Sequence, residues 1–481
     1  MSVRLSGRHT DPADTLATGS LRTGHAYLKW PLKLGPRGVA TMLPLLLAAA
    51  AWSASPAALP SSALPPATNG SKPRLLMAQS PHSDTKPSAA GTGYTKAITP
   101  ERLQERTVLL RTGEAAMARL DLETAISAFD RAALIQHAAD TELSLVRAYM
   151  QGGQYRRALA SGAHTAGAHL DVVAGPVLYA WLLSAGGQDV IGQRLLDEAH
   201  ARMPRNPVVI SVRQQLRSGA PVATGILLNV PLRLAPYSSG PALPHQARVV
   251  GSGLLLASGQ QALVPMAALP KAKSPRLWVR NGMGALSAAT VLARMPKAGV
   301  VLLELGTALP VADTPGVAAT EAFPGSAGFA VEYTANRTAE AAWPLLRTGF
   351  LGGLTGNPAK PEERALGISM PPGPHGGPVF DVAGRLIGLA LTADKSPSRT
   401  SRTSQKTQPI LVSASALRRE LTKVAPTASL GAAPAAPSAT PGRVPLDVIY
   451  ENALKTTLQV IALPWLYRQR QQRLSATPGV S

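Results

Sequence analysis

The stretch that decides the fold is MPPGPHGGPVFD at residues 370–381, followed after two residues by GRLIG at residues 384–388. Its first half gathers glycine and proline around a single histidine, His375, which is typical of an irregular loop. Its second half places short apolar runs on either side of a polar turn, which predicts two strands. The stretch is therefore a loop that leads into a pair of strands, with one histidine at its centre.

This stretch resembles the nucleophile loop of trypsin-like (chymotrypsin-fold) serine proteases, especially the bacterial envelope type. The family pattern is Gly-x-Ser-Gly-Gly-Pro, two apolar residues, a polar turn and Leu-Ile-Gly, and every landmark is present except the serine, whose position is His375. The resemblance implies an oxyanion-hole-like backbone with N–H donors on Gly373 and His375. Pro374 lies between these two residues and has no backbone N–H, but the oxyanion hole does not use a donor at that position. The pocket would then survive although the attacking hydroxyl is lost.

The family pattern also fixes the other two triad positions. A Gly-x-Gly strand leads into VPMAAL at residues 264–269, where the general-base position falls on Ala267. The segment GVVLL at residues 299–303 matches the family's Asp-Leu-Ala-Leu-Leu, so the orienting aspartate falls on Gly299. The resemblance covers about residues 225–420, and all three triad positions are substituted within it.

Two alternatives would keep this domain catalytic. Ser369 is a candidate displaced nucleophile, although it lacks the Gly-Gly that follows the family's serine and has no evident base. His375 is a candidate nucleophile or general base, because imidazole titrates near neutrality, but the sequence shows no carboxylate to orient it. More often, such a histidine fills the vacated pocket.

We expect no cofactor and no metal. The chain has no cysteine, which excludes disulfides and thiolate metal sites. Its nine histidines include no pair at helical ligand spacing within the β-domain, and His164 and His169 lie five residues apart in a helical region. The formal net charge of +21 is scattered and lacks the interleaved aromatics of single-strand binders, so nucleic-acid binding is not expected.

Residues 99–216 resemble tetratricopeptide repeats with a period near 34 residues. Small residues recur at Ala125, Ala158 and Gly192, spaced by 33 and 34, and would let the two helices of each hairpin approach closely. The resemblance implies a surface for a peptide or protein partner, and the alternative is a plain helical bundle. The other matching residues are Gly113, Phe129, Ala132, Tyr149, Gly153, Tyr155, Leu159, Trp181, Gly187, Leu196, Ala199 and Pro204.

The N-terminal segment at residues 1–54 is predicted to be a signal peptide or an uncleaved membrane anchor. A basic flank precedes an apolar run at residues 39–51, which is shorter than the roughly 20 residues of a spanning helix. Pro44 also interrupts this run, and Ala51-Trp52-Ser53 fits a cleavage site. Residues 55–98 are rich in Pro, Ala, Ser and Thr and predict a disordered linker.

Residues 222–424 change to short apolar runs with frequent turn residues, which is the all-β signature of a trypsin-like double β-barrel. The first of the predicted strands is at residues 226–228. Residues 425–443 form a Pro/Ala linker. Residues 444–481 are predicted to hold an amphipathic helix and a basic tail, the helix resting on a membrane surface or on the protein itself. Its recurring apolar residues are Leu446, Tyr450, Leu454, Leu458 and Ile461.

The sequence therefore predicts a multidomain chain in which α-helical tetratricopeptide-like hairpins precede an all-β trypsin-like double barrel. The expected function is that of an exported bacterial pseudoprotease, periplasmic or elsewhere in the cell envelope. It would act as an adaptor or scaffold that binds a protein or peptide partner through its repeats and its protease-like cleft. The alternatives are an active serine-type endopeptidase with a non-standard triad and a purely structural assembly protein.

Overall fold

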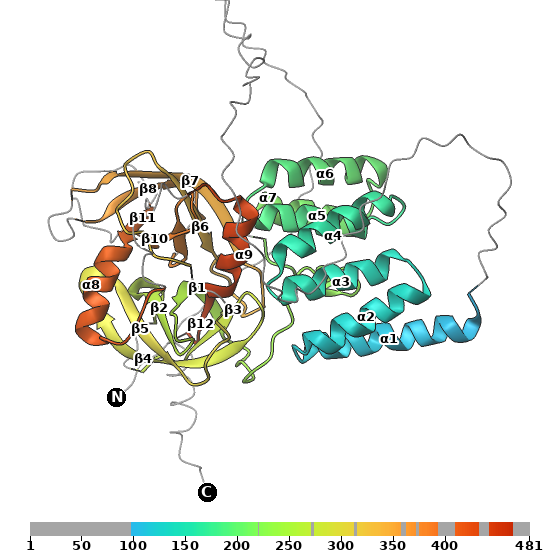
Figure 1. The fold of residues 1–481 in the computed structure, drawn as a ribbon, viewed down its shortest axis with the longest axis horizontal. Coiled ribbons are helices and arrows are strands. Elements are labelled where there is room, and N and C mark those ends of the chain that lie inside the picture. Colours follow the sequence, from blue (N-terminus) through green and yellow to red (C-terminus); the bar gives the residue numbers. More distant parts are fainter. Residues whose placement is uncertain are drawn as a thin grey trace, which may run out of the picture. The chain divides into compact units, whose positions relative to one another are not determined.

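A helical part precedes two closed, antiparallel, six-stranded β-barrels in the computed structural model of the chain (Figure 1). This is the predicted fold class. The structure describes residues 98–219, 221–270, 274–311, 315–356, 362–371, 375–392, 409–431 and 442–464. The predicted leader, most of the predicted linkers, Gly373 and the basic tail lie outside these residues.

The helical part consists of three helical hairpins and one further helix. Thr99 begins the first helix by accepting a hydrogen bond from the backbone N–H of Arg102 at 3.4 Å, and Asn206 caps the last helix in the same way. The hairpins are α1 (Pro100–Ala118) with α2 (Leu122–Ile135), α3 (Ala139–Gln151) with α4 (Tyr155–Ala168), and α5 (Ala174–Ala185) with α6 (Asp189–Arg202), followed by α7 (Pro207–Arg217).

Small residues allow the paired helices to approach closely, as the sequence predicts. A Cβ on Gly192 would lie 2.8 Å from the carbonyl oxygen of Ala180 in α5, and one on Gly113 would lie 2.3 Å from the ring of Phe129 in α2. The inter-helix turns use Gly153 at φ 68°, and the next turn has the same left-handed conformation at φ 83°. Both turn glycines, Gly153 and Gly187, are among the residues that the sequence analysis matches to the repeat.

Each barrel is closed, and the hydrogen bonding between neighbouring strands gives its strand order. The order in barrel 1 is β1-β12-β3-β4-β5-β2, and the order in barrel 2 is β10-β11-β8-β7-β6-β9. Barrel 1 comprises β1 (Arg248–Leu255), β2 (Gln261–Pro265), β3 (Leu277–Asn281), β4 (Leu286–Met295), β5 (Val300–Leu305) and β12 (Thr457–Ala462). Barrel 2 comprises β6 (Ala327–Glu332), β7 (Leu345–Leu354), β8 (Arg364–Ile368), β9 (Pro378–Phe380), β10 (Leu386–Thr392) and β11 (Pro409–Ser413).

The sequence misplaces one element and overlooks others. Residues 226–228 lie in a short 3₁₀ helix, Gly225–Leu228, rather than in a strand. Strands β4 and β7 escape detection because their outward positions are polar, glycine or partly exposed, which interrupts the apolar runs. Helix α8 (Ala414–Val424) follows β11, and Ser413 caps its first turn.

The C-terminal segment corrects the sequence prediction most clearly. Its helix α9 (Leu446–Thr456) ends eight residues before the described part does, and Leu458 and Ile461 belong to strand β12 instead. This strand pairs with β1 on one side and β3 on the other, and so closes barrel 1. The apolar face of α9 is buried against the protein through Tyr450 and Leu454. The segment is therefore an integral part of the barrel domain.

The helical part and the barrels share a continuous apolar core. The side-chain amide of Gln151 accepts a hydrogen bond from Tyr237 N–H at 2.8 Å and donates to the carbonyl oxygens of Tyr237 and Met283, the latter in the β3–β4 turn. The ring of Tyr155 in α4 lies edge-on to that of Tyr450 in α9, with centroids 4.5 Å apart. These contacts fix the helical hairpins against barrel 1.

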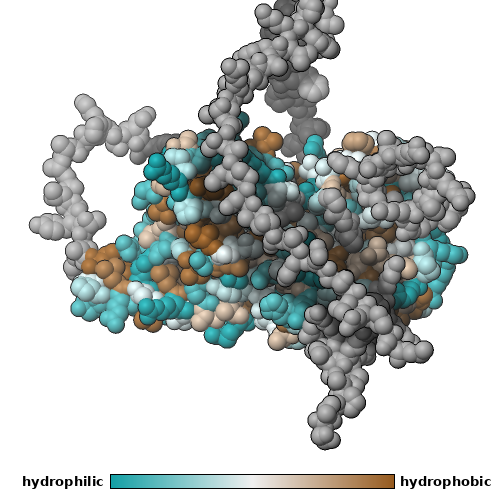
Figure 2. Space-filling model, turned by 180° about the vertical axis from the view of Figure 1, so that it is seen from behind, coloured by the Kyte–Doolittle hydropathy of each residue, from teal (hydrophilic) through white to brown (hydrophobic). Residues whose placement is uncertain are grey.

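No described helix has both the length and the apolar character needed to span a bilayer. Figure 2 shows hydrophobic residues interspersed with hydrophilic ones on one face of the molecule. Exposed large apolar side chains occur on both parts, for example Leu134 on α2 and Phe323 before β6. Scattered residues of this kind do not by themselves define a docking surface.

Candidate functional site

The loop at His375 lies between the two barrels, and its glycines are required there by close packing. A Cβ on Gly376 would lie 2.2 Å from the carbonyl oxygen of Ser252 in β1. A Cβ on Gly377 would lie 2.1 Å from the carbonyl oxygen of Val331 in β6. The Gly-Gly pair is thus needed to pass the chain between a strand of barrel 1 and a strand of barrel 2.

The segments that hold the three predicted triad positions come together at this point. The backbone N–H of Met266, next to Ala267, donates a hydrogen bond to the carbonyl oxygen of Gly299 at 2.9 Å. A Cβ on Gly376, next to His375, would lie 2.5 Å from the ring of Pro265, two residues before Ala267. The nucleophile-like loop, the end of β2 and the start of β5 therefore form one cluster.

The first two positions bring no functional side chain to the cluster. Ala267 lies in the short 3₁₀ turn Met266–Ala268 and is exposed. Gly299 ends the next 3₁₀ turn, Pro296–Ala298, with φ 68° in the left-handed region that favours glycine. Neither residue can remove or hold a proton, so a serine protease mechanism has neither its base nor its orienting acid at these positions.

His375 is buried and faces a carboxylate that the sequence analysis did not anticipate. Its Nδ1 lies 3.1 Å from Oε2 of Glu332 at the end of β6, and the two side chains are 7% and 1% exposed. The other carboxylate oxygen, Oε1, lies 3.6 Å from Nε of Arg347 in β7. Strands β6 and β7 are paired, which places this arginine beside the carboxylate. The imidazole thus belongs to a buried His–Glu–Arg cluster.

The position of Glu332 shows that the sequence analysis was wrong to expect no carboxylate beside His375. Its signal in the sequence is one acidic residue at the end of the apolar run GFAVEY at residues 328–333. A charged side chain in a buried strand is rare unless it is paired. The sequence could therefore have indicated that Glu332 has a buried polar partner. The partner of such a residue lies 43 positions away, so sequence alone does not identify it.

A second group of buried polar residues joins the barrels beside the cluster. Ser252 in β1 accepts a hydrogen bond from Tyr333 N–H at 2.6 Å, and its hydroxyl donates to the Tyr333 carbonyl oxygen at 3.1 Å. Burial lowers the pKa of Arg280 to about 10, while Tyr333 and Glu340 partly offset this effect. The hydrogen bonds between Ser252 and Tyr333 therefore join β1 of barrel 1 to the residue that follows β6 of barrel 2.

The cluster orients an imidazole but, in the part of the chain that the structure describes, pairs it with no hydroxyl. The one hydrogen bond recorded there for the His375 ring is the bond to Glu332. Ser369 follows β8 and is exposed, and no described interaction joins it to a histidine. The predicted donor Gly373 lies outside the described residues, so the oxyanion-hole-like backbone remains a prediction. The geometry supplies a carboxylate-oriented histidine without an attacking group.

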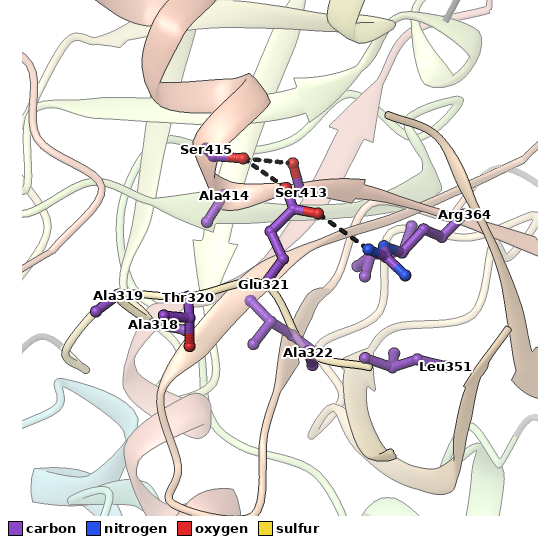
Figure 3. Close-up of a pocket in the computed structure, with 12 residues that line it drawn as sticks. Ala318, Ala319, Thr320, Glu321, Ala322, Leu351, Arg364, Ser413, Ala414 and Ser415 are labelled. Carbon is purple, nitrogen blue, oxygen red and sulfur yellow. Dashed lines mark hydrogen bonds and ion pairs between the residues drawn. The ribbon is translucent and has the colours of Figure 1, made fainter. Parts of the chain in front are cut away.

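A separate small pocket opens on barrel 2, and Figure 3 shows the side chains around it. Glu321 points to Arg364 at 3.1 Å and to Ser415 at 2.8 Å. Burial disfavours the charged form of Glu321, but hydrogen bonds from Ser415, Arg364 and Ser413 outweigh it and lower the pKa of this carboxyl. These polar groups satisfy one another, which suits a structural ion pair better than a ligand site.

The chain matches no protein-family model and no curated protein. Among solved structures it is similar to the MamO protease domain from Magnetospirillum magneticum, with 19% identity, 37% of this chain and 96% of that chain covered, and a TM-score of 0.27. It is similar to the active form of the Rv3671c protease from M. tuberculosis (16% identity, coverage 41% and 84%, TM-score 0.26). It is also similar to the HtrA-type protease AlgW with a decapeptide (18% identity, coverage 36% and 51%, TM-score 0.28). The description of the double barrel rests on the strand pairing of this chain.

Proposed function

We propose that this protein is an exported, catalytically inactive relative of trypsin-like serine proteases that binds protein or peptide partners as an adaptor or scaffold. One observation carries the proposal. The residue at the serine position, His375, is buried and bound to Glu332, while Ala267 and Gly299 offer no base or acid to the same cluster. Removing the triad abolishes the covalent chemistry but leaves the binding surfaces intact.

The helical hairpins support the binding half of the proposal. We assign them as tetratricopeptide-like repeats because small residues recur near every 34 positions. The burial of Ala125 and Ala158 and the close approach of Gly192 to the paired helix support this assignment. Stacked hairpins of this class present an extended surface to a peptide. The proposed cellular location is the bacterial envelope, because we interpret the apolar run at residues 39–51 as part of an export signal.

Catalysis is tested on the full chain with a fluorophosphonate probe and with labelled casein, with trypsin as the positive control in the same buffer. The proposal expects neither labelling nor cleavage after prolonged incubation. Labelling or cleavage that disappears in Ser369→Ala or His375→Ala would overturn the assignment as an inactive protein.

Binding is tested with the immobilised full chain in a bacterial envelope extract, followed by hydrogen exchange on the chain with and without each recovered protein. The proposal expects slower exchange confined to the helical hairpins or to the junction of the barrels. A chain that recovers no protein whose addition slows exchange would instead be the purely structural assembly protein.

One observation favours the second candidate, an active endopeptidase with a non-standard triad. The Glu332 carboxylate orients the His375 imidazole as an acid orients the base of a catalytic triad. This candidate expects casein hydrolysis that Glu332→Gln reduces and His375→Ala abolishes. Hydrolysis unaffected by both substitutions would come from a contaminating protease.

A further inference from the structure

Three histidines surround one carboxylate where the first two helical hairpins meet. Glu142 lies in the first turn of α3, and His137 lies in the connection from α2 to α3. His164 lies near the end of α4, and His169 caps the end of that helix. The helical packing therefore brings together residues from three segments that the sequence spreads over 33 positions.

The distances within this cluster suit a tetrahedral metal site. From Oε1 of Glu142, the Nε2 atoms of His137, His169 and His164 lie at 2.5, 3.5 and 3.6 Å. Ligand atoms of a tetrahedral ion with bonds of about 2.0 Å are separated by roughly 3.3 Å. One ligand atom each from His137, Glu142 and His169 already lies within 4.8 Å of the other two. His164 lies outside this group of three, and its side chain would have to rotate to join it.

Two atoms of the cluster are buried without a hydrogen-bond partner in the part of the chain that the structure describes. They are Nε2 of His169 and Oε2 of Glu142. An unpaired buried polar atom is costly, and a bound cation would satisfy the nitrogen of His169 directly. The side chains of His137 and His164 are 63% and 62% exposed, so an ion in solution can reach the site.

We propose that His137, Glu142 and His169, with His164 as the fourth ligand, bind a first-row divalent transition metal, Zn²⁺ being the best fit. Imidazole nitrogens with one carboxylate suit zinc, whereas calcium and magnesium require oxygen ligands throughout. The ion joins the connection between the first two hairpins to both helices of the second hairpin. It therefore stabilises the order of the hairpins rather than supplying catalysis.

The test uses tag-free full-length protein, stripped with EDTA and titrated with ZnCl₂ at pH 7.5 by calorimetry. We expect one high-affinity Zn²⁺ per chain, a rise in the melting temperature with Zn²⁺ but not with Mg²⁺, and a four-coordinate visible spectrum with Co²⁺. His137→Ala, His169→Ala and Glu142→Gln should each weaken zinc binding at least tenfold. The exposed His245 on the barrel side provides the control His245→Ala, which should bind as the wild type does.

The circular dichroism of each metal-free variant establishes that it is folded before titration. If His169→Ala, which removes a half-buried side chain, fails this check, the exposed His137→Ala variant and the near-isosteric Glu142→Gln variant decide the question. The proposal is overturned if the wild type binds no zinc, or if folded His137→Ala and Glu142→Gln variants bind it undiminished. Undiminished binding would place the ion on other histidines of the chain.

Discussion

His375 Nδ1 and Glu332 Oε2 lie 3.1 Å apart, and both side chains are buried at the junction of the two barrels. The pair joins the loop before β9 to the end of β6, two segments of barrel 2 that are otherwise connected by backbone pairing. With Arg347 on its other oxygen, Glu332 holds the loop in place from within the barrel. His375 thus contributes packing and a polar contact to this junction.

The first prediction concerns this buried cluster. Glu332→Ala should lower the free energy of unfolding by about 3 kcal/mol, because it leaves a buried imidazole and a half-buried guanidinium without their carboxylate. Glu332→Gln keeps the shape and one acceptor and should cost less. Urea denaturation measures both. The matched control is Glu304→Ala on the exposed face of β5, which should change stability by about 0.5 kcal/mol or less.

The second prediction concerns the passage of the loop between the barrels. Gly376→Ala should destabilise the protein by about 3 kcal/mol, because the added methyl would lie 2.2 Å from a backbone carbonyl oxygen that cannot turn away. Gly353→Ala is the control, since a Cβ there meets no atom within 4 Å. Equal thermal unfolding of the two variants would show that the loop does not approach Ser252 so closely.

The third prediction concerns the C-terminal segment. A chain that ends at residue 443 should fail to form barrel 1, because β1 and β3 lose the strand between them. Each large buried apolar side chain contributes about 2 kcal/mol, so removing six of them costs on the order of 10 kcal/mol, comparable to the whole stability of a domain. They are Ile449, Tyr450, Leu454, Leu458, Val460 and Ile461.

A chain that ends at residue 464 is the control for this truncation, because it keeps both α9 and β12. Size-exclusion chromatography and near-UV circular dichroism should show a folded protein for this chain and not for the shorter one. If the shorter chain unfolds as cooperatively as the longer one, the segment is not needed to close barrel 1.

The fourth prediction concerns pH. The hydrogen bonds to Glu321 lower its folded pKa below the ordinary value of 4.5 for this carboxyl, so its ionised form stabilises the folded state above that value. This contribution is lost as the pH falls through the lowered pKa. The stability difference between the wild type and Glu321→Gln should therefore be constant near pH 7 and shrink in that acidic range. Urea midpoints from pH 3 to pH 7 measure it, and a difference independent of pH would contradict the assignment.

The sequence was sufficient for the fold class because its signals are local. Helical hairpins are marked by small residues at regular spacing and by glycine turns such as Gly153, and strands by short apolar runs. Where a strand is half exposed, as in Leu286–Met295, the outward residues break the run and the strand is missed. Positions 267, 299 and 375 were predicted as triad positions from motif spacing alone, and the contacts bring their segments together.

What the sequence by itself determined is the order of helices before barrels and which residues stand at the motif positions, His375 among them, because both depend on neighbours along the chain. The tertiary structure alone decided that residues 457–462 close the first barrel, that Glu332 faces the histidine, and that His137 and Glu142 meet His164 and His169. These relationships join residues far apart along the chain. A single chain records which side chains are present, and only the packing of its elements brings distant ones within hydrogen-bonding distance.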